Sequence, residues 1–244
     1  DDKSYYDKVE LTPEEIFRWA DEKKTTPKTA AVSFEYAEKL LAPCLEAGDD
    51  VIFFGISEEM STTCNVMRLG GQDHPNGRLF VVDSRNLSTG IGLQVLRAAE
   101  LAEQGVSAVE QEREKVRASF VVDTLTYLAR GGRCSGATAL VATTLKLHPC
   151  IQVVEGKMIV GKKYHGSVEK ALLRYEKDLE EELLRADPRR VFITHSGTAP
   201  EVVATIRKRL EELTYFQEIH ETIAGGVISS HCGPGTLGIL FYEK

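Results

Sequence analysis

The chain has 244 residues, of which 42% are hydrophobic, and it carries a formal net charge of -7 with a pI near 5.5. This length and composition suffice for a buried core in one large domain or in two smaller ones. The acidic balance and the lack of a basic run argue against a nucleic-acid partner bound through its phosphates. The longest apolar runs are far below the ~20 residues of a membrane-spanning helix. No secretory signal opens the sequence.

The cysteines are odd in number, widely spaced and without a Cys-x-x-Cys pair. They are Cys44, Cys64, Cys134, Cys150 and Cys232. This pattern is typical of reduced thiols and argues against a disulfide framework or a zinc site. It predicts a cytoplasmic protein.

The first predicted helix runs from about Pro13 to Lys23, because Thr12 suits an N-cap and Glu15 completes a capping box. After it, short and wholly apolar runs alternate with segments of helical spacing, as strands buried on both faces of a parallel sheet do. The predicted elements are helix 33–47, strand 50–57, helix 61–69, strand 78–84 and helix 90–104. This order predicts an N-terminal parallel α/β/α layer.

From about residue 119 onward, hairpins and helices mix, which predicts an α+β domain with a mixed sheet. The predicted strands are 120–123, 150–154, 158–160, 190–194 and 237–242, with a hairpin turn at 155–157 and helices at 168–185 and 200–215. A polar helix over 107–117 is expected to connect the two parts. The predicted domains are therefore residues 1–116 and 117–244.

His231 stands immediately before a glycine-proline turn that precedes an apolar strand. Gly233 and Gly235 open backbone conformations that other residues rarely adopt, and Pro234 stiffens the turn between them. We expect His231 to lie on a rigid loop. A solitary histidine is more often structural than functional, so its interpretation depends on the other loops.

A second loop places hydroxyl groups where an open α/β sheet binds ligands. Ser61 and Thr63 follow a predicted buried strand and open a predicted helix, where free backbone N–H groups favour an anion. Ser33 and Ser57 are better explained as N-caps.

A third loop holds Arg133 behind two glycines, Gly131 and Gly132. An arginine on such a turn suits a carboxylate or a phosphate. The same residues also fit a plain turn before a helix, with Arg133 paired to a carboxylate such as Asp123.

Taken together, these segments resemble the DegV family of two-domain bacterial fatty-acid-binding proteins over almost the whole chain. Residues 82–92 resemble the family's Asp-Ser strand end and Ser-x-Gly-x-Gly helix start, and 127–136 resemble its Leu-x-x-Gly-Gly-Arg-x-Ser loop. Residues 149–157 are similar to its Val-x-x-Gly-Lys hairpin, and 225–238 to its closing His-x-Gly-Pro-Gly segment. The order and spacing of these motifs carry the resemblance.

The resemblance implies a bound long-chain fatty acid, no cofactor, and a carboxylate held by polar groups at a domain interface. The residues that fall on the family's binding positions are Thr29, Ser61 and His231. Two hydroxyls and an imidazole N–H can satisfy a buried carboxylate. Further ligand-binding candidates in the same motifs are Thr63, Arg133, Gly233, Gly235 and, with less correspondence, His165. The implied partner is a fatty acid kinase subunit, which would phosphorylate the presented carboxylate.

The chain departs from the family pattern at several points. Ala30, Ala31 and Val32 replace Ser-Gln-Pro, and Thr62 replaces a glycine. His165 stands where many members have arginine. The resemblance also places the family's first strand and its Thr-Asp-Ser motif ahead of residue 1.

Two other classes of function compete with a lipid carrier. An acyl hydrolase would use Ser61 with His231, but the sequence has no Gly-x-Ser-x-Gly elbow at Ser61 and no assignable third triad member. A phosphate or nucleotide binder would use the glycine loops, but neither the P-loop nor the dinucleotide-binding glycine pattern is present.

Overall fold

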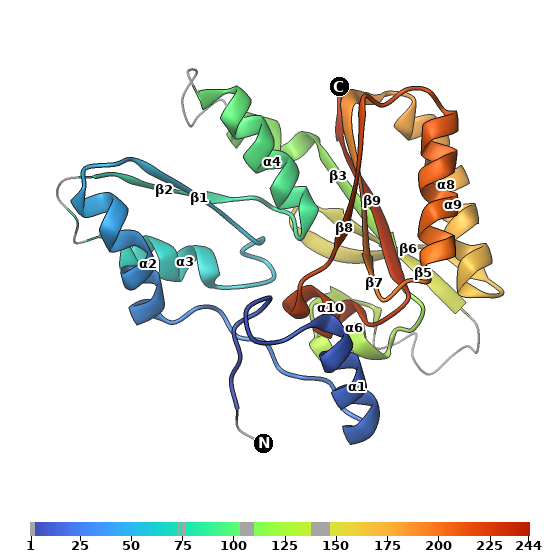
Figure 1. Cartoon of the computed structure of the whole chain (residues 1–244), viewed down its shortest axis with the longest axis horizontal. Coiled ribbons are helices and arrows are strands. Elements are labelled where there is room, and N and C mark those ends of the chain that lie inside the picture. Colours follow the sequence, from blue (N-terminus) through green and yellow to red (C-terminus); the bar gives the residue numbers. More distant parts are fainter. Residues whose placement is uncertain (1–2, 73, 75–76, 103–109, 138–146) are drawn as a thin grey trace. The chain divides into compact units, whose positions relative to one another are not determined.

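The computed structural model describes residues 3–72, 74, 77–102, 110–137 and 147–244. Its contacts divide the chain into two compact units (Figure 1). Unit 1 comprises Asp1–Thr29, Arg117–Val154 and Met158–Lys244, and unit 2 comprises Ala30–Val116 and Glu155–Lys157. This partition differs from the predicted 1–116 and 117–244 because the first residues, through Thr29, group with the C-terminal part of the chain.

Unit 2 is built on a parallel pair of strands. β1 (Val51–Gly55) pairs with β2 (Leu79–Asp83), with Val51 opposite Leu79 and Gly55 opposite Asp83. The helices of this unit are α2 (Phe34–Glu46), α3 (Thr63–Gly70) and α4 (Thr89–Glu100). The strand–helix alternation predicted for this region is confirmed, and the helices begin and end within four residues of the predicted bounds.

The side chains of β1 alternate between two packed faces. Val51 and Phe53 point to a core that α2 and α3 close with Leu41, Leu45 and Met67, among others. Phe54 points the other way, against Ala98 and Leu101 at the end of α4. Because successive side chains of a strand face opposite sides, helices on both faces are needed to bury them.

Unit 1 contains a mixed sheet. Among the described residues, its strand order is β4-β6-β5-β3-β9-β7-β8. The strands are β3 (Val116–Val121), β4 (Cys134–Ser135), β5 (Leu147–Val154), β6 (Lys157–His165), β7 (Ala186–Ser196), β8 (Glu218–Ile223) and β9 (Thr236–Glu243). β7 pairs parallel with β8 and antiparallel with β9, and β3 pairs antiparallel with β5. The predicted α+β unit with a mixed sheet is confirmed.

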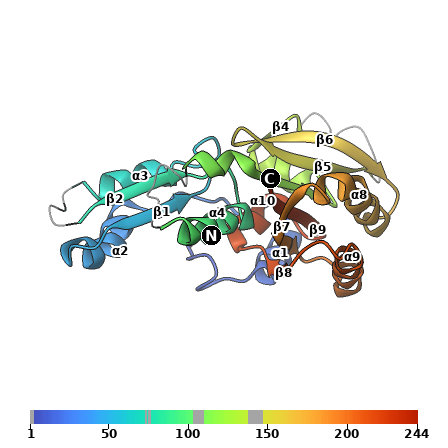
Figure 2. The ribbon, with the colours of Figure 1, turned by 90° about the horizontal axis from the view of Figure 1, so that it is seen from above.

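Two helices, α8 (Val168–Leu183) and α9 (Pro200–Glu212), lie side by side along one face of this sheet (Figures 1 and 2). Tyr175 of α8 is fully buried beneath them. Its hydroxyl donates to Ser119 O at 2.7 Å and accepts from Ile239 N at 3.0 Å. This one side chain therefore fixes α8 to strands β3 and β9.

Three shorter helices of unit 1 pack together: α1 (Pro13–Lys23), α6 (Thr126–Gly131) and α10 (Gly226–Cys232). The capping box of Thr12 and Glu15 opens α1, as predicted. Phe17 of α1 meets Tyr127 of α6 edge to face, with ring centroids 6.2 Å apart. This group of helices brings the start, the middle and the end of the chain into contact.

The prediction of a helix over the polar segment 107–117 is wrong for the C-terminal part of that segment. Arg113–Lys115 form a single 3-10 turn, and the residues from Val116 onward belong to β3. Glutamate, lysine and arginine favour a helix locally, but pairing of β3 in the sheet overrides that preference. Residues 107–109 lie outside the described part of the chain.

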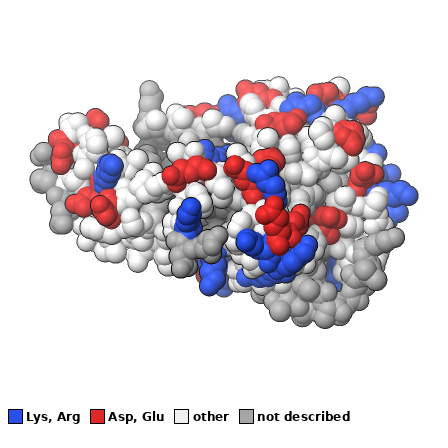
Figure 3. Space-filling model, turned by 60° about the horizontal axis from the view of Figure 1, so that its bottom comes forward, with Lys and Arg blue, Asp and Glu red and all other residues white. Residues whose placement is uncertain are grey.

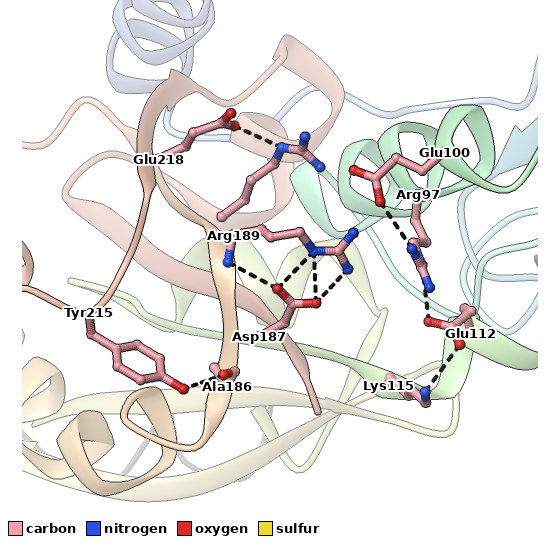
Figure 4. Close-up of polar contacts among 10 residues, drawn as sticks. Arg97, Glu100, Glu112, Lys115, Ala186, Asp187, Arg189, Tyr215 and Glu218 are labelled. Carbon is pink, nitrogen blue, oxygen red and sulfur yellow. Dashed lines mark hydrogen bonds and ion pairs between the residues drawn. The ribbon is translucent and has the colours of Figure 1, made fainter.

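Charged side chains on the surface form local pairs of opposite sign. On the face drawn in Figure 3, basic and acidic side chains are interspersed. Figure 4 shows such contacts in each unit: Glu112 bridges Arg97 at 3.3 Å and Lys115 at 3.1 Å, and Asp187 accepts from Arg189 Nε at 2.9 Å. No helix in the described ranges is long and apolar enough to cross a bilayer.

Candidate functional site

Unit 1 brings two of the predicted binding residues into direct contact. The hydroxyl oxygen of Thr29 lies 2.8 Å from Nε2 of His231, and both residues are half-buried. Thr29 ends the N-terminal segment of the unit, whereas His231 lies in the last turn of α10. A hydroxyl and an imidazole are thus hydrogen-bonded to each other, and when Nε2–H donates to Thr29 Oγ1, the threonine hydroxyl is available to donate to an acidic ligand.

His231 lies on a helix, and the prediction that it occupies a loop is wrong. α10 runs from Gly226 to Cys232, and Gly233 follows it with φ of 78°. The helix ends at Cys232, so the loop starts at Gly233, two residues after the histidine. A helix restricts the backbone and the side-chain rotamers of His231 more than a loop would.

The surroundings of His231 favour its uncharged form. Burial lowers the pKa of the imidazole, and the nearby positive charge of Arg133 lowers it further. A neutral imidazole carries one N–H and one lone pair. Nδ1 is buried and has no hydrogen-bond partner within the described residues, so Nε2, beside Thr29, is the nitrogen that takes part in hydrogen bonding.

The glycine pair before Arg133 lies at the end of α6. Its interpretation as a turn before a further helix stays a prediction, because residues 138–146 lie outside the described part of the chain. Gly131 is the last residue of α6, and Gly132 caps the helix in the left-handed conformation with φ of 66°. A Cβ on Gly131 would overlap Nδ1 of His231. Arg133 donates from Nη1 to Gly131 O at 2.7 Å. The pair therefore lets the imidazole ring lie against the end of α6 and turns Arg133 back toward it.

The backbone conformation and the close packing at positions 233 and 235 both favour glycine. Both adopt positive φ, 78° and 74° respectively. A Cβ on Gly233 would lie 2.7 Å from Cδ2 of Tyr127, and one on Gly235 would lie 3.0 Å from Cβ of Asp123. Close packing of the loop against α6 and against Asp123, which follows β3, accounts for both residues without a ligand.

In unit 2, Ser61 and Thr63 lie together at the start of α3. Their hydroxyl oxygens are 3.0 Å apart, and Thr63 N donates to Ser61 Oγ at 3.3 Å. Ser57 is fully buried and accepts from Glu59 N, and Ser33 accepts from Tyr36 N as the N-cap of α2. The interpretation of Ser33 as an N-cap is confirmed, while Ser61 and Thr63 form a pair of hydroxyls at a strand-to-helix junction.

His165 occupies a different place from the other candidates. It is the exposed last residue of β6, and its carbonyl accepts from Arg174 Nη1 at 3.5 Å. In the described part of the chain, no group of three or more histidine, cysteine, aspartate or glutamate side chains could hold a metal ion.

Sequence reasoning missed two residues that support the site, Asp7 and Tyr127. Tyr127 packs on Gly233, and Asp7 contacts the first residues of α10. The closely spaced glycines at 225, 226, 233 and 235 were the available signal, because each marks a place where another group approaches the backbone.

A family model described as "Uncharacterised protein, DegV family" matches residues 1–244. The chain belongs to the DegV family. A DegV domain-containing protein of Deinococcus radiodurans is 33% identical over 241 residues, covering 96% of this chain and 85% of the relative. A second, from Caldanaerobacter subterraneus, is 29% identical over 254 residues, covering 100% of this chain and 88% of the relative. The predicted family is confirmed.

Solved DegV structures share the fold. A Thermus thermophilus DegV protein, described in terms of fatty acid binding, superposes with a TM-score of 0.87 at 33% identity, covering 98% of this chain and 87% of that one. The DegV protein of Bacillus subtilis, described as a fatty acid binding protein, gives a TM-score of 0.84 at 25% identity, covering 99% and 88%. These descriptions apply to those two proteins.

Proposed function

We propose that this protein binds a long-chain fatty acid and holds its carboxylate through Thr29 and His231. The observation that carries the proposal is the 2.8 Å contact between the Thr29 hydroxyl and His231 Nε2. In a DegV protein whose structurally similar relatives are described as fatty acid binding, this pair offers a hydroxyl donor for a carboxylate. One arrangement that fits has Nε2–H donating to Thr29 Oγ1 while the threonine hydroxyl donates to the ligand.

The hydroxyls of Ser61 and Thr63 are proposed as further donors. Their 3.0 Å spacing lets one hydroxyl donate to the other while that one donates to the carboxylate. The acyl chain would supply most of the affinity. At ~0.8 kcal/mol per buried CH₂, a sixteen-carbon tail contributes on the order of 11 kcal/mol before the ordering cost of binding is subtracted.

We further propose that the chemistry belongs to a partner kinase in the cytoplasm. The kinase would transfer a phosphoryl group from ATP to the carboxylate and release an acyl phosphate and ADP. Arg133 supports this role, because a guanidinium close to His231 suits paired oxygen acceptors on a carboxylate or phosphoryl group. His165, exposed at the end of β6, is proposed to contact the partner.

The first experiment is organic extraction of the purified protein followed by mass spectrometry. A fatty acid near one equivalent is expected. If the protein carries no fatty acid and takes up neither added palmitate nor oleate, the proposal is wrong.

The second experiment measures palmitate affinity and ester turnover in the same variants. Loss of one hydrogen bond to a charged group costs ~1.5 to 3 kcal/mol, so Thr29→Val and Ser61→Ala should each weaken binding roughly ten- to a hundredfold. His231→Ala should weaken binding as well, because the Thr29 hydroxyl then loses the N–H that directs it toward the ligand. Thr25→Val and Thr62→Ala are matched controls, since both are exposed neighbours in the same segments. Turnover of an ester that Ser61→Ala abolishes, with product affinity retained, would instead establish a hydrolase.

The third experiment supplies the kinase subunit and ATP to the loaded carrier. Arg133→Ala should reduce acyl-phosphate formation strongly while changing fatty acid affinity less than Ser61→Ala does. His165→Ala should raise the kinase concentration needed for half-maximal rate. Wild-type rates in both variants would remove these two residues from the proposed kinase step and leave the binding proposal standing.

A further inference from the structure

The first turn of α10 is held by an aspartate from the opposite end of the chain. Asp7 Oδ1 accepts from Gly226 N at 2.5 Å, and Asp7 Oδ2 accepts from Val227 N at 3.0 Å. The residues are 219 and 220 positions apart in sequence, and all of them belong to unit 1. Both carboxylate oxygens of Asp7 are therefore used on one helix end.

Gly225 and Gly226, at this end of α10, leave room for the Asp7 carboxylate. A Cβ on Gly225 would lie 2.8 Å from Oδ2 of Asp7, and a Cβ on Gly226 would lie 2.8 Å from Oδ1. Such distances are shorter than real Cβ atoms adopt. Only glycine at both positions lets the carboxylate approach the backbone this closely.

The contact with Asp7 stabilises the N-terminus of a short helix. The first N–H groups of any helix have no partner within it, and a helix of seven residues has little stability of its own. A carboxylate supplies acceptors for two of these groups and a negative charge where the helix dipole is positive. Lys8 adds a third link, because its Nζ donates to Ile223 O at 3.3 Å, just ahead of α10.

The same N-terminal segment meets α10 again at its other end. Thr29 lies against His231 in the last turn, so the segment from Asp7 to Thr29 contacts both the first and the last turn of the helix. Between these two points, Ile16 of α1 lies close enough to Gly226 that a Cβ there would be 2.8 Å from its Cδ1.

We infer that Asp7 is a positioning residue for His231: it sets the place of α10 and thereby the distance from the imidazole to Thr29. The consequence for lipid affinity rests on the proposed function. The consequence for the His231 ring does not depend on any ligand.

The test compares Asp7→Ala with Glu15→Ala in the full chain. Glu15 is the matched control, because it is also an acidic N-cap partner in the N-terminal segment, but it caps α1. The first readout is the side-chain nitrogen NMR signal of His231, assigned among the six histidines by its loss in His231→Gln. The second is palmitate affinity by displacement of a fluorescent fatty acid.

In Asp7→Ala, we expect a shifted Nε2 signal and palmitate binding weakened by about tenfold, the factor for one lost hydrogen bond to a charged group. Glu15→Ala should leave both unchanged. Asp7→Asn, which keeps the shape and one acceptor, should give an intermediate shift and decides the matter if Asp7→Ala does not fold. An unshifted His231 signal in a folded Asp7 variant overturns the inference. A wild type that binds no palmitate overturns only the proposed function, because the NMR comparison still applies.

Discussion

The Thr29 hydroxyl lies 2.8 Å from Nε2 of His231, although 202 positions separate the two residues in the chain. Neither residue reaches the other through local structure. Thr29 is brought there by the N-terminal segment, and His231 by α10.

Replacing Gly131 by alanine should disturb His231 more than any change at the surface of α6. A Cβ at this position would overlap the Nδ1 atom, so the ring must move away from its place beside Thr29. We expect at least tenfold weaker palmitate binding, the equivalent of about one hydrogen bond to a charged group. Gly92→Ala is the control, since a Cβ on Gly92 meets no atom within 4 Å and its φ is not positive. Equal affinity of Gly131→Ala and wild type would contradict the described packing.

Protonation of His231 should destabilise the folded protein. Burial, and then Arg133, lowers the pKa of His231 in the folded state below the value of 6.5 that applies to an unfolded chain. Between these two values the unfolded state binds more protons, so stability falls as the pH drops below 6.5 and the loss is complete below the folded-state pKa. Urea unfolding of wild type and His231→Asn from pH 8 to pH 5 measures the difference. If the free energy of unfolding of His231→Asn depends on pH as that of the wild type does, His231 does not contribute to the pH dependence and the prediction is wrong.

The effect of the Arg133 charge on the pKa of His231 can be separated from the effect of burial by substitution. In Arg133→Gln, the pKa of His231 should rise toward 6.5 but stay below it, because burial is the larger cause. An NMR titration of the His231 ring measures this directly. A pKa that falls or does not change in the variant would show that the guanidinium charge does not act on the imidazole.

Removal of the Tyr175 hydroxyl should weaken unit 1. Tyr175→Phe leaves the amide of Ile239 and the carbonyl of Ser119 without this partner in a fully buried place, which costs ~1 to 3 kcal/mol of unfolding free energy. Tyr5→Phe, at a side chain that is 53% exposed, should change nothing measurable. Chemical denaturation of both variants gives the comparison, and equal midpoints would contradict the role of Tyr175.

Native thiol reactivity should be limited to one cysteine. Cys44 is exposed, whereas burial raises the pKa of Cys64 to about 11 and those of Cys150 and Cys232 to about 12, and raises that of Cys134 as well. Only a thiolate attacks a disulfide reagent. At pH 8, Ellman's reagent should react rapidly with one thiol in the native protein and with all five in urea, and Cys44→Ser should abolish the fast phase.

The elements that sequence predicts well are those decided by neighbouring residues. Three residues in a stretch of four, Thr12, Pro13 and Glu15, specify the start of α1. The apolar runs of β1 and β2 specify buried parallel strands. α10 was missed for the opposite reason. Its two leading glycines disfavour a helix locally, and the helix forms where Asp7 supplies acceptors from 219 residues away.

The site was predictable only in part for the same physical reason. Family motifs point to Thr29, Ser61 and His231, but not to the groups that hold them. The two glycines at 131 and 132 do not reveal from sequence that a helix ends there, whereas the left-handed conformation of Gly132 marks the end of α6. β8 was also missed, since Glu218–Ile223 lies at the edge of the sheet and its only apolar residues, Ile219 and Ile223, form neither an apolar run nor a regular alternation.

The contacts of Asp7 and Thr29 with α10 also set an order of assembly during synthesis. Unit 2 is drawn almost entirely from the continuous stretch Ala30–Val116 and has its partners available as soon as that stretch has emerged from the ribosome. The segment that precedes unit 2 has no such partners at that time. It packs against residues 226–231, which are synthesised about two hundred positions later. Contacts of such long sequence separation form slowly. A ribosome stalled after unit 2 should therefore carry a folded unit 2 preceded by an N-terminal segment that proteases can still cut, and protection of that segment should begin only once α10 has been released.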